Sequence, residues 1–379
     1  MSAGEEVEVD STTSVDSSAE EATQLSELGF YVLAGAPKSP AELLDEVPTA
    51  ESLGLGNAFI SERFNIKEAV TLSGAVGAVS RRLVIATAAT NHNTRHPAVT
   101  AAYATTMHRL TGGRFALGLG RGIEPLFDAF GIPRITTAQI EDFAQLLRRL
   151  FRGELVIGHD GPAGKFPVLH LDSSFDEDIP IGVVAFGPNT LSLAGRAMDM
   201  VVLHTYFTDE TVERCVKTVR EAAERAGRDP AAVRIWSCYA TVHDGLPREL
   251  QLKKTVGRLA TYLQGYGDLL VRTNRWDPEV LQRFRADSVV SAAPGAIDDK
   301  AGAATLEHVA ALLPPEWLEP AATGSPERCA ERVLHQFDLG VDGVILHGAS
   351  PGQLAPVVEA YRRIRPENRF DALAQNPGR

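Results

Sequence analysis

Cysteine is scarce in this chain, and its three cysteines, Cys215, Cys238 and Cys329, lie far apart without C-x-x-C spacing. An odd count without spacing indicates reduced thiols in a cytoplasmic protein rather than a disulfide framework. No run approaches the ~18 apolar residues of a membrane-spanning helix. The first residues are acidic and no apolar segment follows them, so we expect neither a signal peptide nor a membrane partner.

Positive charge is also in short supply. Lys and Arg number 37 against 49 Asp and Glu, a formal charge of −12, which disfavours a nucleic-acid partner. Backbone amides and a few arginines can still bind a small anion locally. No Lys or Arg precedes Lys38, and residues 1–24 are rich in Ser, Thr, Glu and Ala. We expect a disordered acidic tail over 1–24 and a single domain over 25–370.

Short apolar runs alternate with helical patterns through the rest of the chain. Capping boxes at Ser39–Glu42 and at Thr136–Gln139 open two of the helices. Because eight nearly all-apolar strands separated by helices favour a closed parallel sheet, the sequence predicts an α/β fold, a (β/α)8 TIM barrel. The expected strands cover residues 29–33, 57–60, 83–87, 114–119, 179–184, 200–203, 233–236 and 343–346.

Two stretches interrupt this alternation. Residues 154–178 resemble a long loop containing a short hairpin, and residues 265–322 contain irregular helical pieces marked by Gly and Pro. In a barrel, such insertions usually lie at the C-terminal face of the strands, and a surface insertion without a role is the alternative.

The active site of such a barrel lies at the C-terminal ends of its strands. The expected strand ends carry polar, aromatic and glycine residues, typical of a site for a large planar ligand with a phosphate. The segment Gly187-Pro188-Asn189 opens a helix, and its free amides suit an anion, although a plain helix cap is the default. The strand ends are Ala34-Gly35, Ser61-Glu62-Arg63, Thr90-Asn91-His92-Asn93, Gly120-Arg121-Gly122, Phe186-Gly187-Pro188-Asn189, His204-Thr205-Tyr206, Tyr239 and His347-Gly348.

A run from Arg109 to Gly122, RLTGGRFALGLGRG, carries a specific resemblance. Together with LVIATAATNHNTRHP (residues 83–97) and AFGPNTLSLAGRAMD (residues 185–199), it resembles the luciferase-like monooxygenase superfamily, and within it the coenzyme F420-dependent oxidoreductases. The resemblance spans roughly residues 28–245 and 325–365 and leaves 246–322 unmatched.

The resemblance implies a flavin-like ring in the barrel mouth. A bulge after the third strand, often with a non-prolyl cis peptide, would press on the ring at Thr90-Asn91-His92. Contacts to the ring and its ribityl chain would fall on Gly120-Arg121-Gly122, and phosphate contacts on Gly187-Pro188-Asn189. Glu62-Arg63 replaces the Asp-His pair that several deazaflavin enzymes carry after the second strand, so the general acid does not transfer from the family.

Hydride addition to a carbonyl or imine leaves an atom that needs a proton. His92 can titrate near neutrality and is our first candidate for the donor, with Glu62 second. A structural turn at His92, a partnership of Glu62 with Arg63, and a pairing of Arg121 with Glu124 are the alternatives. Cys238 is expected in the core.

These observations favour an F420-dependent oxidoreductase that transfers a hydride between the deazaflavin and a small-molecule substrate with a carbonyl, imine or activated alkene. An FMN-dependent two-component monooxygenase and a cofactor-binding barrel without catalysis are the alternatives. A metal-dependent hydrolase using His92, His96, His204 and His347 is less favoured, and no metal is expected. We expect the chain to act as a homodimer.

Overall fold

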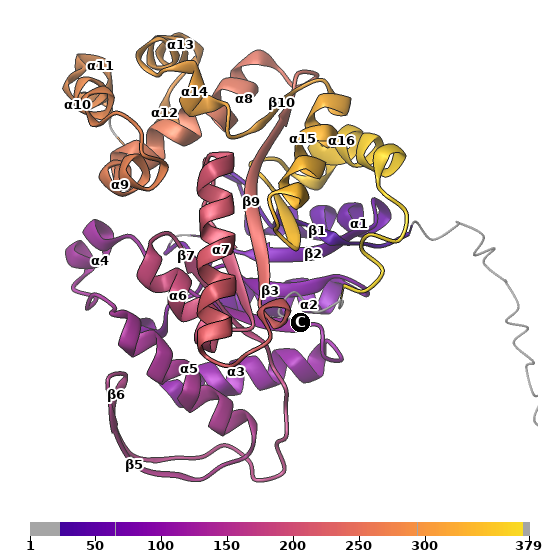
Figure 1. Ribbon diagram of the computed structural model, residues 1–379, viewed down its shortest axis with the longest axis vertical. Coiled ribbons are helices and arrows are strands. Elements are labelled where there is room, and N and C mark those ends of the chain that lie inside the picture. The colour runs from indigo at the N-terminus through magenta and orange to yellow at the C-terminus, as the bar shows by residue number, and fades with distance from the viewer. Residues whose placement is uncertain (1–22, 65, 294, 374–379) are drawn as a thin grey trace, which may run out of the picture.

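The computed structural model describes residues 23–64, 66–293 and 295–373, so the expected acidic tail falls almost entirely outside the described residues. Eight parallel strands close into a barrel surrounded by helices, which confirms the predicted (β/α)8 fold (Figure 1). The strands follow one another around the barrel in chain order, and the last pairs with the first. They are β1 (Leu25–Tyr31), β2 (Leu55–Ile60), β3 (Val84–Thr87), β4 (Phe115–Leu119), β7 (Ile181–Ala185), β8 (Met200–Leu203), β9 (Arg234–His243) and β11 (Gly343–His347).

Helices cover the outside of the barrel, and the helix starts expected from the sequence are found at three places. The Ser39 capping box starts a 3-10 turn, η1 (Pro40–Glu42), ahead of the first α-helix. The Thr136–Gln139 box starts α5, and Gly187 precedes α6 with Pro188 in its first turn. The covering helices are α1 (Leu43–Ser52), α2 (Ala69–Val79), α3 (Pro97–Leu110), α4 (Glu124–Phe130), α5 (Thr137–Phe151), α6 (Pro188–Ala197), α7 (Asp209–Arg225), α15 (Pro326–Asp338) and α16 (Pro351–Ile364).

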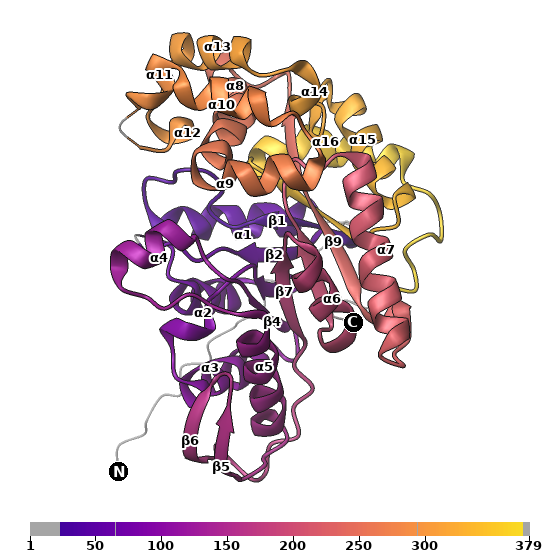
Figure 2. The same ribbon diagram turned by 60° about the vertical axis from the view of Figure 1, so that its left-hand side comes forward.

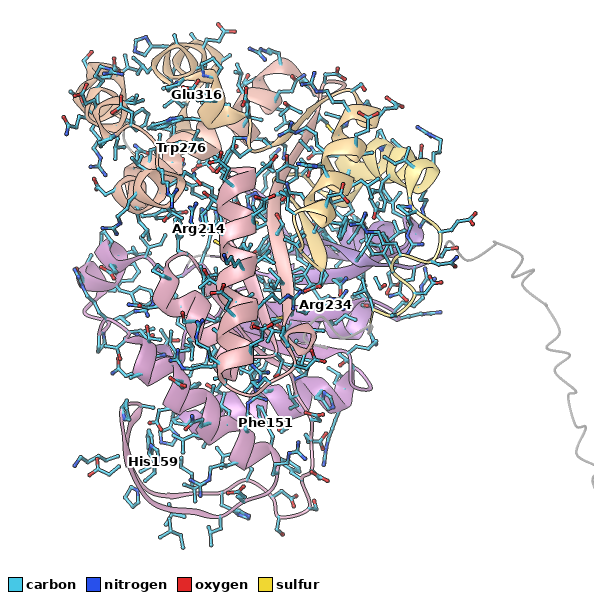
Figure 3. The ribbon with its side chains drawn as sticks, in the orientation of Figure 1. Phe151, His159, Arg214, Arg234, Trp276 and Glu316 are labelled. Carbon is cyan, nitrogen blue, oxygen red and sulfur yellow. The ribbon has the colours of Figure 1, made fainter. Side chains whose placement is uncertain are left out.

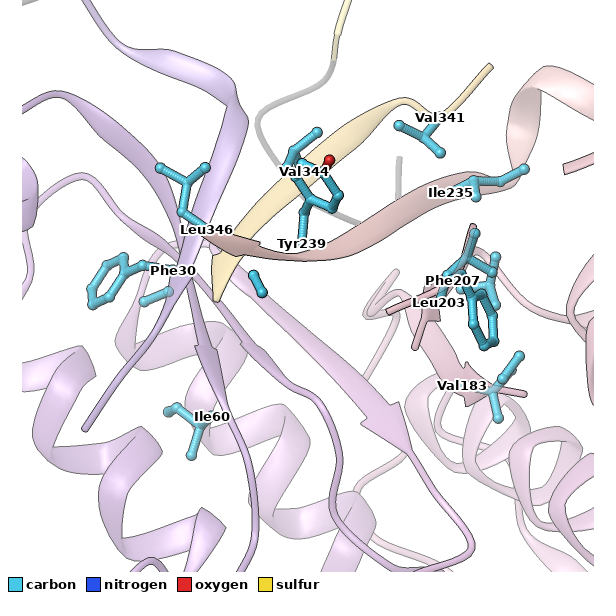
Figure 4. Packing of buried hydrophobic residues seen from close by; sticks show 14 of the residues in the cluster. Phe30, Ile60, Val183, Leu203, Phe207, Ile235, Tyr239, Val341, Val344 and Leu346 are labelled. Carbon is cyan, nitrogen blue, oxygen red and sulfur yellow. The ribbon is translucent and has the colours of Figure 1, made fainter. Parts of the chain in front are cut away.

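The strands carry apolar side chains on both faces, because one face packs inside the barrel and the other against the helices. Figure 4 shows part of the layer between strands and helices, with Phe30, Ile60, Val183, Ile235 and Leu346. A separate cluster fills the barrel interior. Its buried members are Phe59, Ala86, Ala88, Ala116, Met200, Val202, Trp236, Cys238 and Ile345.

The first irregular stretch forms a hairpin, β5 (Val156–Gly161) and β6 (Gly164–Leu169), that lies outside the barrel. It follows α5 and packs alongside α5 and α3: His159 contacts Asp142 at 3.0 Å, and the ring of Phe166 meets that of His96 at 5.3 Å. Figure 2 shows it at the opposite end of the molecule from α10–α14. The hairpin therefore packs on the outer surface, against the starts of α3 and α5.

The second irregular stretch lies at the C-terminal end of β9. Trp276, in the link after the long helix of this stretch, stacks on Trp317 of a later short helix with ring centres 4.5 Å apart (Figure 3 labels Trp276). The elements are α8 (Arg248–Leu252), η4 (Lys253–Gly257, one π-helical turn), α9 (Arg258–Asn274), α10 (Pro278–Ala286), α11 (Ser288–Ser291), α12 (Ile297–Lys300), α13 (Ala303–Leu312), α14 (Pro315–Leu318) and β10 (Ala322–Gly324).

One expected strand end, that of β9, is wrong. β9 runs to His243, well beyond the predicted 233–236, because β10 adds parallel pairing along its last residues. Tyr239 therefore lies within the strand. It packs in the outer layer, where its hydroxyl accepts a hydrogen bond of 3.1 Å from Nε of Arg332.

Among the described residues, no helix has the length and apolar character needed to cross a membrane.

Candidate functional site

A cavity of about 1200 Å³ opens at the C-terminal ends of the strands. Most residues expected to bind a cofactor line it, and they come from segments that follow β2, β3, β4 and β7. Residues from α7 and α9 complete the wall. The predicted residues among its lining are Glu62, Asn91, Gly120, Arg121, Gly122, Gly187, Pro188 and Asn189.

The segment after β3 bulges toward this cavity. Thr90, and not Ala89, pairs with Leu119 of the neighbouring strand, so one extra residue is accommodated between Ala86 and Thr90. A non-prolyl cis peptide joins Ala88 and Ala89, just before the position Thr90–His92 at which the family resemblance places it. Both alanines line the cavity, so the bulge presents a flat apolar surface to a ligand.

Thr90, in contrast, faces a buried ion pair. Two guanidinium nitrogens of Arg95 donate to the Glu62 carboxylate, at 2.6 and 3.2 Å, and Thr90 Oγ1 also donates to it. The Glu62 side chain is 2% exposed, and Arg95 also forms an ion pair with Glu68. The partner of Glu62 is therefore Arg95 and not Arg63, the alternative weighed from the sequence.

The glycines after β4 allow the backbone to pass close to the bulge. A Cβ on Gly120 would stand 2.8 Å from Cβ of Ala89, and Gly122 has a φ of +74°. The side-chain amide of Asn91 fastens the two segments by donating to Gly120 O at 2.8 Å. Arg121 does not bind Glu124: its guanidinium donates to Ile135 O at 2.6 Å and to the Thr137 hydroxyl.

The N-terminus of α6 opens directly on the cavity. Gly187 is the N-cap residue, without a side-chain cap, and no atom lies within 4 Å of where its Cβ would stand. Pro188 and Asn189 are exposed in the first turn. The unfilled space and the positive end of the helix suit a phosphate.

A histidine–tyrosine pair faces the α6 side of the cavity. Nδ1 of His204 contacts Thr205 O at 2.8 Å, which requires a proton on Nδ1, so Nε2 accepts from the Tyr266 hydroxyl at 2.9 Å. Burial lowers the pKa of His204 to about 4 and raises that of Tyr266 well above its usual value. Both residues line the cavity, and the His204 ring packs on Phe186 at 4.4 Å.

Sequence reasoning placed His204 only at a strand end and missed Tyr266. Tyr266 lies in α9, in the segment that matched no family pattern, and its backbone is non-helical (φ −154°, ψ 37°). A tyrosine at the fourth position after Tyr262, on one helical face, was the only signal in the sequence.

His92 and His96 lie apart from this pair. His92 is buried against Phe143, with ring centres 5.1 Å apart, and it is absent from the cavity lining. Burial lowers its pKa to about 4. His96 caps α3 by accepting from Ala98 N. In the described part of the chain, no three His, Cys, Asp or Glu side chains are grouped as metal ligands would be.

Comparisons with known proteins identify the family of the chain. The family model for luciferase-like monooxygenases matches residues 13–343. A 5,10-methylenetetrahydromethanopterin reductase from Methanolobus tindarius is 26% identical over 302 residues, covering 78% of this chain and 86% of the reductase.

Two solved structures share the fold. The coenzyme F420-dependent tetrahydromethanopterin reductase from Methanopyrus kandleri has a TM-score of 0.73 at 19% identity, covering 89% of this chain and 99% of that one. An F420-dependent secondary alcohol dehydrogenase in complex with an F420–acetone adduct has a TM-score of 0.64 at 17% identity, covering 91% and 99%. The family match covers most of the chain, which therefore belongs to the luciferase-like monooxygenase family of oxidoreductases.

Proposed function

We propose that the chain is an F420-dependent oxidoreductase that transfers a hydride between the deazaflavin ring and an organic substrate bearing a carbonyl, an imine or an activated alkene. The observation that carries this proposal is the joint placement of the Ala88–Ala89 bulge and the open N-terminus of α6 on one large cavity. Relatives that act with F420 support it.

The residues present fit such a cofactor. The apolar bulge offers a surface for a planar ring, and the backbone of Gly120-Arg121-Gly122 lies beside it for the ribityl chain. The amides at the start of α6 would hold the phosphate, at a position where Gly187 leaves room for it. A bound deazaflavin supplies or accepts a hydride at its ring carbon.

Tyr266 and His204 would handle the proton that accompanies the hydride. His204 is neutral, with its proton on Nδ1, so its Nε2 can accept the hydroxyl proton of Tyr266. The Tyr266 oxygen can at the same time accept a proton from a substrate hydroxyl. Thr205 O then stabilises the imidazolium through Nδ1–H. In the reverse direction the proton returns by the same path to the substrate oxygen. This pair lines the cavity, whereas His92, the first candidate from the sequence, does not. Glu62 remains the second candidate.

Two alternatives keep the fold. The family match favours an FMN-dependent two-component monooxygenase, because luciferase-like proteins give the family its description. A cofactor-binding barrel without catalysis is consistent with Glu62 being held by Arg95.

Isothermal titration with F420 and with FMN, each added separately to the purified chain, tests the proposal. We expect F420 to bind with a dissociation constant in the micromolar range or tighter. Binding of FMN without binding of F420 would assign the monooxygenase alternative. Binding of F420 with no hydride transfer to any of a panel of ketones, imines and enones, nor from the matching alcohols and amines, would favour the non-catalytic alternative.

A further inference from the structure

Four basic side chains converge on one side of the barrel mouth. Lys67 donates to Leu33 O after β1, and Lys254 donates to Gly348 O after β11. Arg63, after β2, donates to Gly35 O at 3.4 Å. Arg258, at the start of α9, completes this cationic cluster of Arg63, Lys67, Lys254 and Arg258. Because β11, β1 and β2 are neighbours in the barrel, the strand order itself brings these residues together.

The four charges lie close enough to act on one another. Burial, together with the charges of Arg63 and Arg258, lowers the pKa of Lys67 to about 7. Burial lowers the pKa of Lys254 to about 8, again with Arg258 contributing. Each ammonium is thus held among like charges, an arrangement that costs free energy until an anion joins it.

Compensation inside the protein is incomplete. Asp298 pairs with Arg258 at 2.8 Å. The Glu46 carboxylate accepts from Leu33 N at 2.7 Å and lies near Lys67 and Lys254. Arg63, Lys67 and Lys254 each donate to a backbone carbonyl oxygen. Within the described residues, no carboxylate lies within 4 Å of any of these three cations. Glu42 also acts on Lys67, so four cations face three carboxylates, in a chain whose net charge is −12.

The cluster is accessible and adjoins the proton-transfer pair. Arg63 is solvent-exposed, whereas Lys67 and Arg258 are buried, so Arg63 forms the open side. Arg63 directly follows Glu62, which lines the cavity. The guanidinium carbon of Arg258 lies 5.9 Å from the ring centre of Tyr262, which stacks on Tyr266 with ring centres 5.5 Å apart. Burial raises the pKa of Tyr266, and the charges of Arg258 and Arg63 both oppose that rise. Nδ1 of His347, at the end of β11, is buried without a hydrogen-bond partner in the described chain.

We propose that Arg63, Lys254, Arg258 and His347 form a subsite for an anionic group of the substrate, a carboxylate or a phosphate. This inference rests on the proposed function, because only an enzyme has a substrate. An anionic group at the subsite has two possible sources, the substrate and the acidic tail of the cofactor. In the ring of eight strands, β1 stands opposite β7, which leads into α6. A cofactor phosphate at α6 would therefore lie across the mouth from this subsite, which favours the substrate.

Phosphate binding to the full chain without cofactor tests the subsite. Inorganic phosphate is titrated calorimetrically into the wild type, Gly187→Asp, Arg63→Gln and Lys254→Gln. Loss of one charge-assisted contact lowers affinity about 10- to 100-fold. We expect Gly187→Asp to keep a phosphate site that Arg63→Gln and Lys254→Gln weaken by at least tenfold. Arg283→Gln, at an exposed position of α10, serves as the matched control and should bind like the wild type.

The subsite would be overturned if Gly187→Asp abolished phosphate binding while the cluster variants left it unchanged. Binding of an adventitious ion only, insensitive to every variant, would also overturn it, as would no binding at all. The cofactor decides the source of the anion. Unchanged F420 affinity in Arg63→Gln and Lys254→Gln assigns the subsite to the substrate, and a tenfold loss in both overturns this by assigning it to the cofactor tail. If F420 fails to bind the wild type, the proposed function fails while the phosphate titration still reports on the cluster.

Discussion

The hydroxyl of Tyr266 donates a 2.9 Å hydrogen bond to Nε2 of His204, joining a helix outside the barrel pattern to the end of β8. Thr205 O fixes the histidine tautomer from the other side. Nε2 is therefore the basic nitrogen of this histidine, and the tyrosine hydroxyl connects it to the cavity.

Tyr266→Phe should lower turnover about 100-fold or more, because it removes the atom through which the substrate exchanges its proton. F420 affinity should change little, since the phenyl ring remains. Steady-state kinetics and a cofactor titration measure the two effects. Tyr262→Phe is the matched control: its ring stacks on Tyr266 at 5.5 Å, and it should retain activity within a few fold. Equal losses in both variants would contradict the relay.

Gly187→Asp should weaken F420 binding at least tenfold while the fold stays intact. The new carboxylate would stand at the helix N-terminus where the cofactor phosphate is expected, and charge-assisted contacts are worth roughly 1.5–3 kcal/mol. The change fits locally because nothing lies within 4 Å of the Cβ position. Gly302→Asp, at the equally open N-cap of α13, should leave affinity unchanged. An unchanged dissociation constant in Gly187→Asp would place the phosphate elsewhere.

The protein should lose stability as the pH falls from about 6.5 to about 4. Burial depresses the pKa of His92 and of His204 to about 4 in the folded state, against about 6.5 in the unfolded chain. Between these values the unfolded chain binds more protons, so acid favours unfolding, by about 1.4 kcal/mol per pH unit for each histidine. Urea denaturation at stepped pH measures the slope.

His92→Gln should remove its share of that pH dependence, while the share of His204 remains. It should leave turnover at neutral pH within a few fold, because His92 packs against Phe143 away from the cavity. A hundredfold loss of turnover at unchanged cofactor affinity would instead assign the proton-donor role to His92.

Glu62→Gln should lower the free energy of unfolding by about 1.5–3 kcal/mol, since it removes the buried one of the two counter-charges of the partly buried Arg95. Glu327→Gln, which breaks the exposed pair with Arg363, should cost less than about 1 kcal/mol. Chemical denaturation compares them. Equal, small losses would show that Glu62 and Arg95 are effectively solvated.

The sequence by itself determined the barrel, because strands buried on both faces need continuous apolar runs, and helix caps and glycines mark where each unit ends. It also placed Glu62, Gly120 and Gly187 at the cavity, since parallel strands bring their C-terminal ends to one face of the barrel. Only the tertiary structure decided the rest. It directed His92 into the core beside Phe143, paired Glu62 with Arg95, and brought Tyr266 against His204 across 62 residues. Side-chain direction and long-range contacts such as these depend on packing between elements, which local periodicity does not encode.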